Sequence, residues 1–281
     1  MLYNNMRVIN MAGCNHDCAN CASKCDKKDF IIHTNDLSKI RKNIGIVSGK
    51  GGVGKSLVTS LLASCAAKNG YKTAILDGDI LGPSIPKMFG IKDKAYGDQT
   101  GKFIIPANGP LDIDVISSSM LLANDEDPII WRGSMVSNIL KQFYTDVIYG
   151  EQDIIFIDMP PGTGDVPLTV FQSIPLDGII IVTSPSDLVS MIVEKAVNMA
   201  KMMNIPIIGI VENYAYIECP DCKKKIYMYG ESKVKQKAID NNIKHFISLP
   251  LNPEVATLVD QGQVYKANSS YFDELINEIM G

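Results

Sequence analysis

From Asn43 to the end of the chain, short apolar runs bounded by Gly, Pro and Asp alternate with longer stretches of helical periodicity. Such runs predict strands of a parallel sheet whose two faces are covered by the intervening helices. The predicted strands are Ile44–Val47, Thr73–Leu76, Asp112–Ile116, Ile154–Ile157, Gly178–Val182, Pro206–Val211 and Phe246–Leu249. The predicted helices are Ser56–Lys68, Met135–Ile148, Asp187–Met203, Glu231–Asn241 and Ser269–Met280. The pattern therefore predicts an α/β fold, doubly wound, with a mostly parallel sheet and helices on both faces.

The first 40 residues do not share this pattern. They contain a cluster of four cysteines followed by a polar, charged stretch. We therefore expect two parts, a cysteine-rich N-terminal segment at residues 1–40 and one α/β domain at residues 41–281. A chain of 281 residues is long enough to bury a core without disulfide bonds.

A glycine-rich loop directly follows the first predicted strand and precedes an apolar helix. Its sequence is Gly49-Lys50-Gly51-Gly52-Val53-Gly54-Lys55-Ser56. In the arrangement of strand, glycine-rich turn and helix, backbone N–H groups and a helix N-terminus converge on phosphate groups. Lys55 is expected to reach the β- and γ-phosphates, and the Ser56 hydroxyl to bind Mg²⁺. The loop therefore predicts a P-loop that binds ATP and Mg²⁺.

The same loop also fits the dinucleotide fingerprint G-x-G-x-x-G, and Asp77 follows Gly54 by 23 positions, near where a ribose-binding acid would lie. Three features favour the P-loop. A Lys-Ser pair follows the last glycine, a second acid (Asp79) follows Asp77, and Ile154–Asp158 is an apolar strand that ends in Asp, as in a Walker B motif.

The acids at the ends of the predicted strands complete this site. Asp79 is expected to bind Mg²⁺ or to orient the attacking water, and Asp158 to meet Mg²⁺ through a water molecule. The Pro-Pro-Gly stretch after Asp158 is expected to change conformation with the γ-phosphate. Lys50 is unusual for a P-loop. Its ammonium is either a solvated loop charge or a group that reaches a phosphate across a subunit interface, much as an arginine finger does.

Two groups of cysteines predict metal sites. Cys219-Pro220-Asp221-Cys222 has polar flanks, and two thiolates at this spacing suit Zn²⁺ or an iron–sulfur cluster, but they supply only half of a four-ligand shell. The rest must come from a second subunit or from the N-terminal cysteines. A thioredoxin-like redox pair is the less favoured alternative, because that motif opens a helix in another βαβ context.

The second group is Cys14, Cys18, Cys21 and Cys25. On a straight helix these cysteines would spread over roughly 16 Å, so a shared metal requires a loop. A ferredoxin-like [4Fe–4S] cluster is the first choice there and zinc the second. The seventh cysteine, Cys65, lies among alanines on the first predicted helix and is expected in the core.

Composition argues against nucleic acid and membranes as partners. The chain is 46% hydrophobic and 21% charged with a net charge of −4, which argues against nucleic acid as a main partner. No apolar run approaches the roughly 20 residues of a membrane span, and the N-terminus has no signal-peptide pattern. We therefore expect a cytoplasmic protein without a membrane partner, in which the seven cysteines are metal ligands or core residues rather than disulfides.

Together these residues resemble the Mrp/ApbC-type iron–sulfur carrier ATPases, relatives of MinD and of the nitrogenase iron protein. The resemblance runs from about Asn43 to Gln263. It rests on Gly49–Ser56 with the deviant Lys50, Asp77–Pro86, Trp131-Arg132-Gly133, Asp158–Asp165, Glu212-Asn213, Cys219 with Cys222, and Leu249-Pro250-Leu251. The run Asp-x-Pro-Pro-Gly-Thr-Gly-Asp combined with Cys-Pro-x-Cys is specific to that family.

The resemblance implies a homodimer with ATP at its interface, in which Lys50 acts across the interface and Asn213 contacts adenine. It also implies a labile [4Fe–4S] cluster shared by Cys219 and Cys222 of both subunits and transferred to apo iron–sulfur proteins. We therefore expect an ATPase that carries clusters, with slow turnover because the nucleotide acts as a conformational switch.

The residues argue against two other classes of protein. A MinD- or ParA-like organiser of membrane or DNA would need a basic amphipathic C-terminal helix or a basic face. Residues Asn268–Gly281 contain three acids, and no Lys or Arg follows Lys266. A nitrogenase-type reductase would need bridging cysteines in the middle of the domain, but none lies between Cys65 and Cys219.

Overall fold

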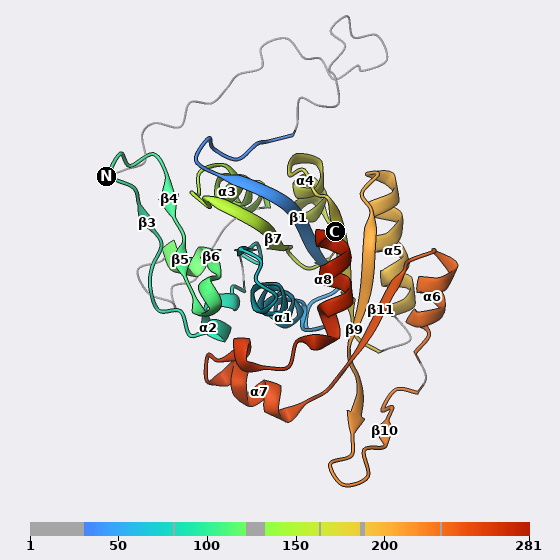
Figure 1. Cartoon of the computed structure of the whole chain (residues 1–281). Coiled ribbons are helices and arrows are strands. Elements are labelled where there is room, and N and C mark those ends of the chain that lie inside the picture. The colour runs from blue at the N-terminus through green and yellow to red at the C-terminus, as the bar shows by residue number, and fades with distance from the viewer. Residues whose placement is uncertain (1–30, 81, 122–132, 163, 186–188, 231) are drawn as a thin grey trace, which may run out of the picture.

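The computed structural model describes residues 31–80, 82–121, 133–162, 164–185, 189–230 and 232–281 (Figure 1). Cys14, Cys18, Cys21 and Cys25, the pair Trp131-Arg132 and Thr163 lie outside the described residues. No helix in the described part of the chain is long and apolar enough to cross a bilayer.

A nine-stranded sheet forms the centre of the described molecule, in the order β10-β9-β8-β1-β7-β2-β6-β5, with β11 also paired to β9. Neighbouring strands are parallel except β10 and β5, which pair antiparallel at the two ends. The strands are β1 (Lys39–Ser48), β2 (Thr73–Asp77), β5 (Ala107–Asn108), β6 (Asp114–Ser117), β7 (Glu151–Asp158), β8 (Gly178–Thr183), β9 (Ile207–Glu218), β10 (Lys225–Ile226) and β11 (His245–Pro250). A separate small hairpin joins β3 (Tyr96–Gly97) and β4 (Ile104–Ile105). The predicted doubly wound, mostly parallel fold is confirmed.

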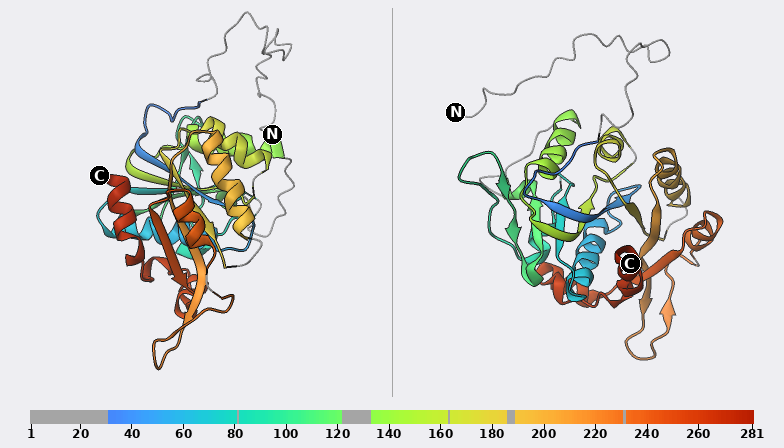
Figure 2. Two further views of the ribbon diagram at one scale, coloured as in Figure 1. Left: turned by 90° about the vertical axis from the view of Figure 1, so that its right-hand side faces the viewer. Right: turned by 45° about the horizontal axis from the view of Figure 1, so that its top comes forward.

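Helices cover both faces of the sheet, and each face has its own apolar core (Figure 2). One core contains side chains of α1 (Lys55–Lys68), α2 (Ile85–Phe89), α7 (Pro253–Asp260) and α8 (Asp273–Met280). The other contains side chains of α3 (Gly133–Thr145), α4 (Asp165–Ser173), α5 (Val189–Met202) and α6 (Val234–Asp240). The central strands are buried on both faces, because side chains from β1, β2 and β7 enter both cores. This explains why their sequences are continuous apolar runs.

Helix α1 lies deep in the first core, with ten of its fourteen residues buried. Cys65 is one of them, and its thiol donates a hydrogen bond of 3.2 Å to Asp273 of α8. Burial, followed by the Asp273 carboxylate, raises the pKa of the Cys65 thiol to about 12. The thiol is therefore kept protonated as a core group, and the expectation that Cys65 packs in the core is confirmed.

Several predicted elements were wrong in their bounds, among them the helix expected at Met135–Ile148, which spans Gly133–Thr145. The strand expected at Asp112–Ile116 starts at Asp114, because Leu111 and Asp112 adopt left-handed φ of 61° and 59° in a 3₁₀ turn. The last helix begins at Asp273 and is preceded by a 3₁₀ turn at Ser270–Phe272. The strand expected to end at Val211 continues to Glu218, so Cys219 does not follow a loop but the end of a strand.

The domain also begins earlier than residue 41. Strand β1 starts at Lys39, and residues before it bind the domain through hydrogen bonds. Ile32 N donates to Ser173 O at 2.8 Å, and the Asn35 side chain donates to Thr145 O and Val147 O at 2.9 and 2.7 Å. Residues 32–38 are therefore attached to the α/β domain.

Candidate nucleotide site and cysteine hairpin

The glycine-rich loop connects β1 to α1, as the sequence predicts. Gly52 and Gly54 have φ of 80° and 79°, a conformation that residues with a Cβ rarely adopt. A Cβ at Gly54 would also lie only 2.2 Å from the side-chain nitrogen of Asn213, so this position has no room for a side chain. The loop is tied down by a hydrogen bond of 2.8 Å from Gly162 N to Ser48 O.

Asp158 organises the end of the loop from the neighbouring strand. Its carboxylate is fully buried and lies 2.6 Å from the Lys55 ammonium, which is itself 5% exposed. It also accepts hydrogen bonds from the hydroxyls of Ser56, at 2.6 Å, and Thr59, at 2.8 Å. One carboxylate thus holds both P-loop side chains that were expected to bind phosphate and Mg²⁺.

Asp77 lies beside Asp158, because β2 and β7 pair in a register that places these two residues opposite each other. The Asp77 carboxylate is fully buried and accepts a hydrogen bond of 3.0 Å from Ser117 on β6. Burial, and then the charge of Asp158, raise the pKa of Asp77 to about 7, although Lys55 and Ser117 oppose the shift. Two carboxylates that share one ammonium in a dry environment favour retention of a proton on one of them.

This shift predicts a pH dependence of stability. The pKa of Asp77 is 3.8 unperturbed and about 7 in the folded protein, so the folded state binds more protons between these values. The nucleotide-free protein should therefore lose stability as pH rises from about 4 to 7 through this group. Asp77→Asn removes the titration and should flatten the melting temperature over that window.

Asp98→Asn serves as the control for this prediction. Hydrogen bonds from Thr100 and from backbone N–H groups lower the pKa of the exposed Asp98 to about 2. Its contribution to stability is lost only as pH falls through that value, below the window tested. If Asp77→Asn and Asp98→Asn show the same slope as the wild type from pH 4.5 to 7, the buried proton is not on Asp77.

Asp79 is placed differently from Asp77. It is half-buried, lines the cavity next to the P-loop, and its N–H donates a hydrogen bond of 3.3 Å to Asp77. Burial raises the pKa of Asp79, while the Lys55 ammonium opposes the rise. A half-buried carboxylate that faces the cavity beside Lys55 could bind a hydrated cation or hold a water molecule there.

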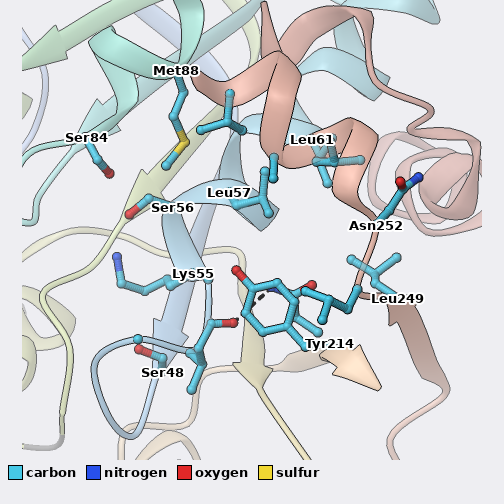
Figure 3. Close-up of a pocket in the computed structure, with 18 of the residues that line it drawn as sticks. Ser48, Lys55, Ser56, Leu57, Leu61, Ser84, Met88, Tyr214, Leu249 and Asn252 are labelled. Atoms are coloured by element: carbon cyan, nitrogen blue, oxygen red, sulfur yellow. Dashed lines mark hydrogen bonds between the residues drawn. The ribbon is translucent and has the colours of Figure 1, made fainter. Parts of the chain in front are cut away.

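A cavity of about 440 Å³ opens over the loop. In Figure 3, Lys55, Ser56 and Ser84 lie on one side of it and Leu61, Leu249 and Asn252 on the other, with Tyr214 between them. The cavity is lined by residues 50–56, Asp79 and Asn213, whereas Gly49 and Asp158 do not line it. Its apolar wall consists of Leu57, Leu61, Met88, Leu249, Leu251, Val255 and Val259. The cavity therefore has a phosphate-binding end and an apolar end.

The donors of this cavity fit a triphosphate. Apart from the ion pair with Asp158, the buried Lys55 Nζ has no hydrogen-bond acceptor among the described residues, so it has donors to spare. The N-terminus of α1 points its backbone N–H groups at the same place, and no acidic side chain lies in its first turn. Ser56 and Asp79 present to the cavity the hydroxyl and carboxylate oxygens that Mg²⁺ prefers, and the buried Asp158 lies behind them and holds Ser56.

Asn213 is buried, and its side chain donates a hydrogen bond of 3.0 Å to the backbone oxygen of Val53 in the P-loop. It therefore joins β9 to the loop, and its expected contact with adenine remains a prediction. Lys50 is half-buried and lines the cavity, while its backbone oxygen accepts a hydrogen bond of 3.1 Å from Ser48. No ion pair or hydrogen bond holds the Lys50 ammonium within the described parts of the chain.

Cys219 and Cys222 lie at the tip of the hairpin between β9 and β10, which projects from the body of the molecule (Figures 1 and 2). Two backbone hydrogen bonds of 3.0 Å close the turn: Cys219 N donates to Lys224 O, and Lys223 N donates to Cys219 O. Hydrogen bonds from the backbone N–H groups of Cys222 and Asp221, and from the Cys222 thiol, lower the pKa of Cys219. The turn therefore favours the thiolate, the form that binds metals.

The hairpin holds only part of a metal site. No group of three or more Cys, His, Asp or Glu side chains that could hold a metal ion occurs among the described residues. Four large side chains that follow the tip, Ile226, Tyr227, Met228 and Tyr229, are exposed. The tip thus presents two sulfur ligands beside an apolar surface.

Some site residues were missed from the sequence. Thr59 binds Asp158, Ser117 binds Asp77, and helix α7 supplies one wall of the cavity. The start of α7 had a signal that could have been used. Asn252 is an N-cap whose side chain accepts a hydrogen bond from Glu254 N, and Pro253 occupies the first helical position. Thr59 and Ser117 had no such signal, because their partners are distant in sequence.

A glycine-rich loop between the first strand and helix, with acids at the ends of the adjacent parallel strands, defines a P-loop NTPase. Residues 39–281 match the sequence model of the family described as "ParA: NUBPL iron-transfer P-loop NTPase". The chain belongs to this iron-transfer P-loop NTPase family, and the resemblance inferred from its motifs is confirmed.

Relatives and solved structures agree with this assignment. The chain is 42% identical over 263 residues to the iron-sulfur cluster carrier protein of Clostridium perfringens, covering 88% of this chain and 92% of that protein. It is also 42% identical over 231 residues to the iron-sulfur cluster carrier protein of Saccharolobus solfataricus, covering 82% of this chain and 77% of that protein. A nucleotide-binding protein from Archaeoglobus fulgidus in complex with ADP has a TM-score of 0.74 at 39% identity, covering 83% and 91%. The cell division ATPase MinD of Pyrococcus furiosus shares the fold, with a TM-score of 0.60 at 18% identity. That match covers 85% of this chain and 98% of MinD.

Proposed function

We propose that this protein is an ATP-dependent iron–sulfur cluster carrier that transfers a [4Fe–4S] cluster to apo iron–sulfur proteins. The observation that carries the proposal is the course of β9. Asn213 lies at the P-loop, and Cys219 lies six residues further along, at the tip of the projecting hairpin. At ~3.3 Å per residue for an extended strand, the two lie at most about 20 Å apart on one continuous segment. A change in the nucleotide site can thus reach the cysteines directly.

The cargo is proposed to be held between two copies of the chain. Cys219 and Cys222 offer two sulfur ligands, and a [4Fe–4S] cluster takes four. A homodimer related by a two-fold axis would bring two hairpin tips together and supply all four. The exposed apolar residues next to the tip would be covered in that dimer. The relatives named iron-sulfur cluster carrier proteins support a cluster as the cargo.

The nucleotide chemistry follows from the P-loop. Lys55 and the N-terminus of α1 would bind the β- and γ-phosphates, and Ser56, Asp79 and Asp158 would hold Mg²⁺, which supplies charge neutralisation at the phosphates. Asp79, which faces the cavity, would orient the attacking water. The ADP-bound relative supports a nucleotide at this place.

The part of the N-terminal segment that precedes the attached residues 32–38 is proposed as a separate metal-binding part. Its cysteines Cys14, Cys18, Cys21 and Cys25 would hold a second [4Fe–4S] cluster or a zinc ion. Because residues 32–38 bind the α/β domain, this part would join the domain through a short, attached connection. The spacing of the four cysteines in the sequence supports the proposal.

Carrier function is tested by transfer. The protein is loaded with iron and sulfide under anaerobic conditions and mixed with an apo enzyme that needs a [4Fe–4S] cluster for activity. The expected result is recovery of acceptor activity with loss of cluster absorbance from the carrier. Acceptor that remains inactive while the cluster stays on this protein would exclude the carrier role.

Lys50 gives a separate prediction about the dimer. If its ammonium, which has no partner among the described residues, acts across the interface, Lys50→Ala should still bind ATP. It should lose hydrolysis by roughly 10²-fold, since a charge that stabilises the transferred phosphoryl group is removed. Mixing Lys50→Ala with Lys55→Ala should then restore part of the activity. In that heterodimer one site has its own Lys55 and receives Lys50 from the other chain.

The measurement is steady-state ATPase activity of each variant and of the mixture, with heterodimer formation checked by two different affinity tags. Lys42→Ala, on β1 and outside the cavity, is the matched control. Heterodimers that form but show no more activity than the separate variants would show that Lys50 acts within its own chain.

A further inference from the structure

Tyr214 has a backbone conformation that is unusual for a bulky residue. Its φ is 59°, although it lies within strand β9. The pairing of β9 changes here. Its register with β8 ends at Glu212, and its register with β11 shifts between Glu212 and Tyr216. Left-handed residues other than Gly cluster at functional sites, because the surrounding structure must enforce them.

This conformation places the tyrosine ring in the nucleotide cavity. Tyr214 lines the cavity, and in the view of Figure 3 its ring lies between Lys55 and Leu249. Its hydroxyl is close to the P-loop, since a Cβ at Gly54 would lie 2.8 Å from it. The hydroxyl makes no hydrogen bond with any other described residue. A half-buried aromatic ring with a free hydroxyl is thus held at the junction of the two ends of the cavity.

The neighbours of Tyr214 in the strand hold it there. Asn213 is bonded to Val53 O, and the buried Glu212 accepts a hydrogen bond of 2.5 Å from Ser232. The Asn213 bond attaches the strand to the P-loop, and the Glu212 bond attaches it to the segment just before α6. The backbone of Tyr214 is therefore positioned by the bonded residues before it, while its own side chain is left for another contact.

We propose that the Tyr214 ring is a contact surface for the adenosine part of the bound nucleotide. The inference rests on the proposed nucleotide site and adds to it a residue that contacts the sugar and base. The phosphates are bound by the P-loop, so the adenosine must extend from there toward the apolar wall of Leu249, Leu251 and Val255. The ring stands on that path. Aromatic side chains bind the flat faces of bases and sugars with little loss of conformational freedom.

The test compares two ligands, ADP with Mg²⁺ and inorganic pyrophosphate with Mg²⁺, by isothermal titration calorimetry. Pyrophosphate has the phosphates but no sugar or base. Tyr214→Ala should weaken ADP binding by about tenfold and leave pyrophosphate binding unchanged. Tyr214→Phe keeps the ring and should lose much less ADP affinity than Tyr214→Ala. Tyr96→Ala, an exposed tyrosine on β3 outside the cavity, is the control.

Three results would overturn the inference. Equal losses for ADP and pyrophosphate in Tyr214→Ala would make the ring a support for the P-loop. Tighter ADP binding would show that the ring obstructs the site, and unchanged ADP binding would show that it makes no contact. Wild-type protein that binds neither ligand would instead contradict the nucleotide site itself. Melting temperatures of all variants show whether each one is folded.

Discussion

Replacing Lys55 by alanine is expected to abolish ATP hydrolysis, with a loss of roughly 10²- to 10³-fold or more in kcat. The Lys55 ammonium is buried against Asp158 and has donors free to bind the γ-phosphate. Without it, the charge that develops in phosphoryl transfer loses the P-loop cation that the ion pair with Asp158 holds in place. The measurement is phosphate release at saturating ATP and Mg²⁺.

The fold must be checked in the same experiment. Lys55→Ala leaves the buried Asp158 carboxylate without its cation, and breaking a buried ion pair costs about 3–5 kcal/mol. Lys55→Gln is the better-tolerated variant, because its amide can still donate a hydrogen bond to Asp158 but carries no charge. Lys72→Ala, at an exposed position outside the cavity, is the control. Wild-type hydrolysis by a folded Lys55→Gln protein would falsify the assigned role of Lys55.

Removing one hairpin cysteine is expected to remove the shared cluster entirely. Wild-type dimer should contain roughly four iron atoms at this site, in addition to metal at the N-terminal cysteines. Cys219→Ala leaves one sulfur ligand per chain, which cannot complete a four-ligand shell even in a dimer. The same variant should lose metal-dependent dimerisation and should fail to activate an apo acceptor enzyme.

The measurement is iron, sulfide and zinc per chain after anaerobic purification, together with the oligomeric state from light scattering. Deleting residues 1–30 removes the N-terminal cysteines without touching β1 or the bonds of residues 32–38, and should leave the shared cluster in place. Cys65→Ala is the matched control, since Cys65 is buried in the core. One zinc per monomer bound through Cys219 and Cys222 would leave a nucleotidase without a carrier function.

The local pattern of the chain was enough to predict the fold class and the P-loop. Strand β7 and helix α1 are both marked by apolar residues within their own segments. A local apolar pattern is therefore enough to predict each of them. The glycine-rich loop is equally local, because Gly54, Lys55 and Ser56 act through their own backbone and through the start of their own helix. Elements whose conformation depends on residues close in sequence could thus be predicted from the sequence.

The pattern was less informative where polar residues are buried inside a strand. The apolar run is interrupted after Val211 by Glu212 and Asn213, so the sequence predicted an end of the strand there, but β9 continues to Glu218. Hydrogen bonds to β11 and β10 hold this second half. Pairing with strands that are distant in sequence carries β9 past the two buried polar residues Glu212 and Asn213, which a local apolar pattern cannot place inside a strand.

By itself, the sequence determined which chemical groups this protein has: a P-loop with Lys55 and Ser56, acids at strand ends, and a cysteine pair two residues apart. Only the tertiary structure decided how they are arranged. The register of β2 with β7 placed Asp77 beside Asp158 and raised the pKa of Asp77. The left-handed conformation of Tyr214 within β9 placed its ring next to the P-loop. The physical reason is that charge coupling and close packing depend on distances in space. Those distances are set by strand order and register, which join residues far apart in the chain.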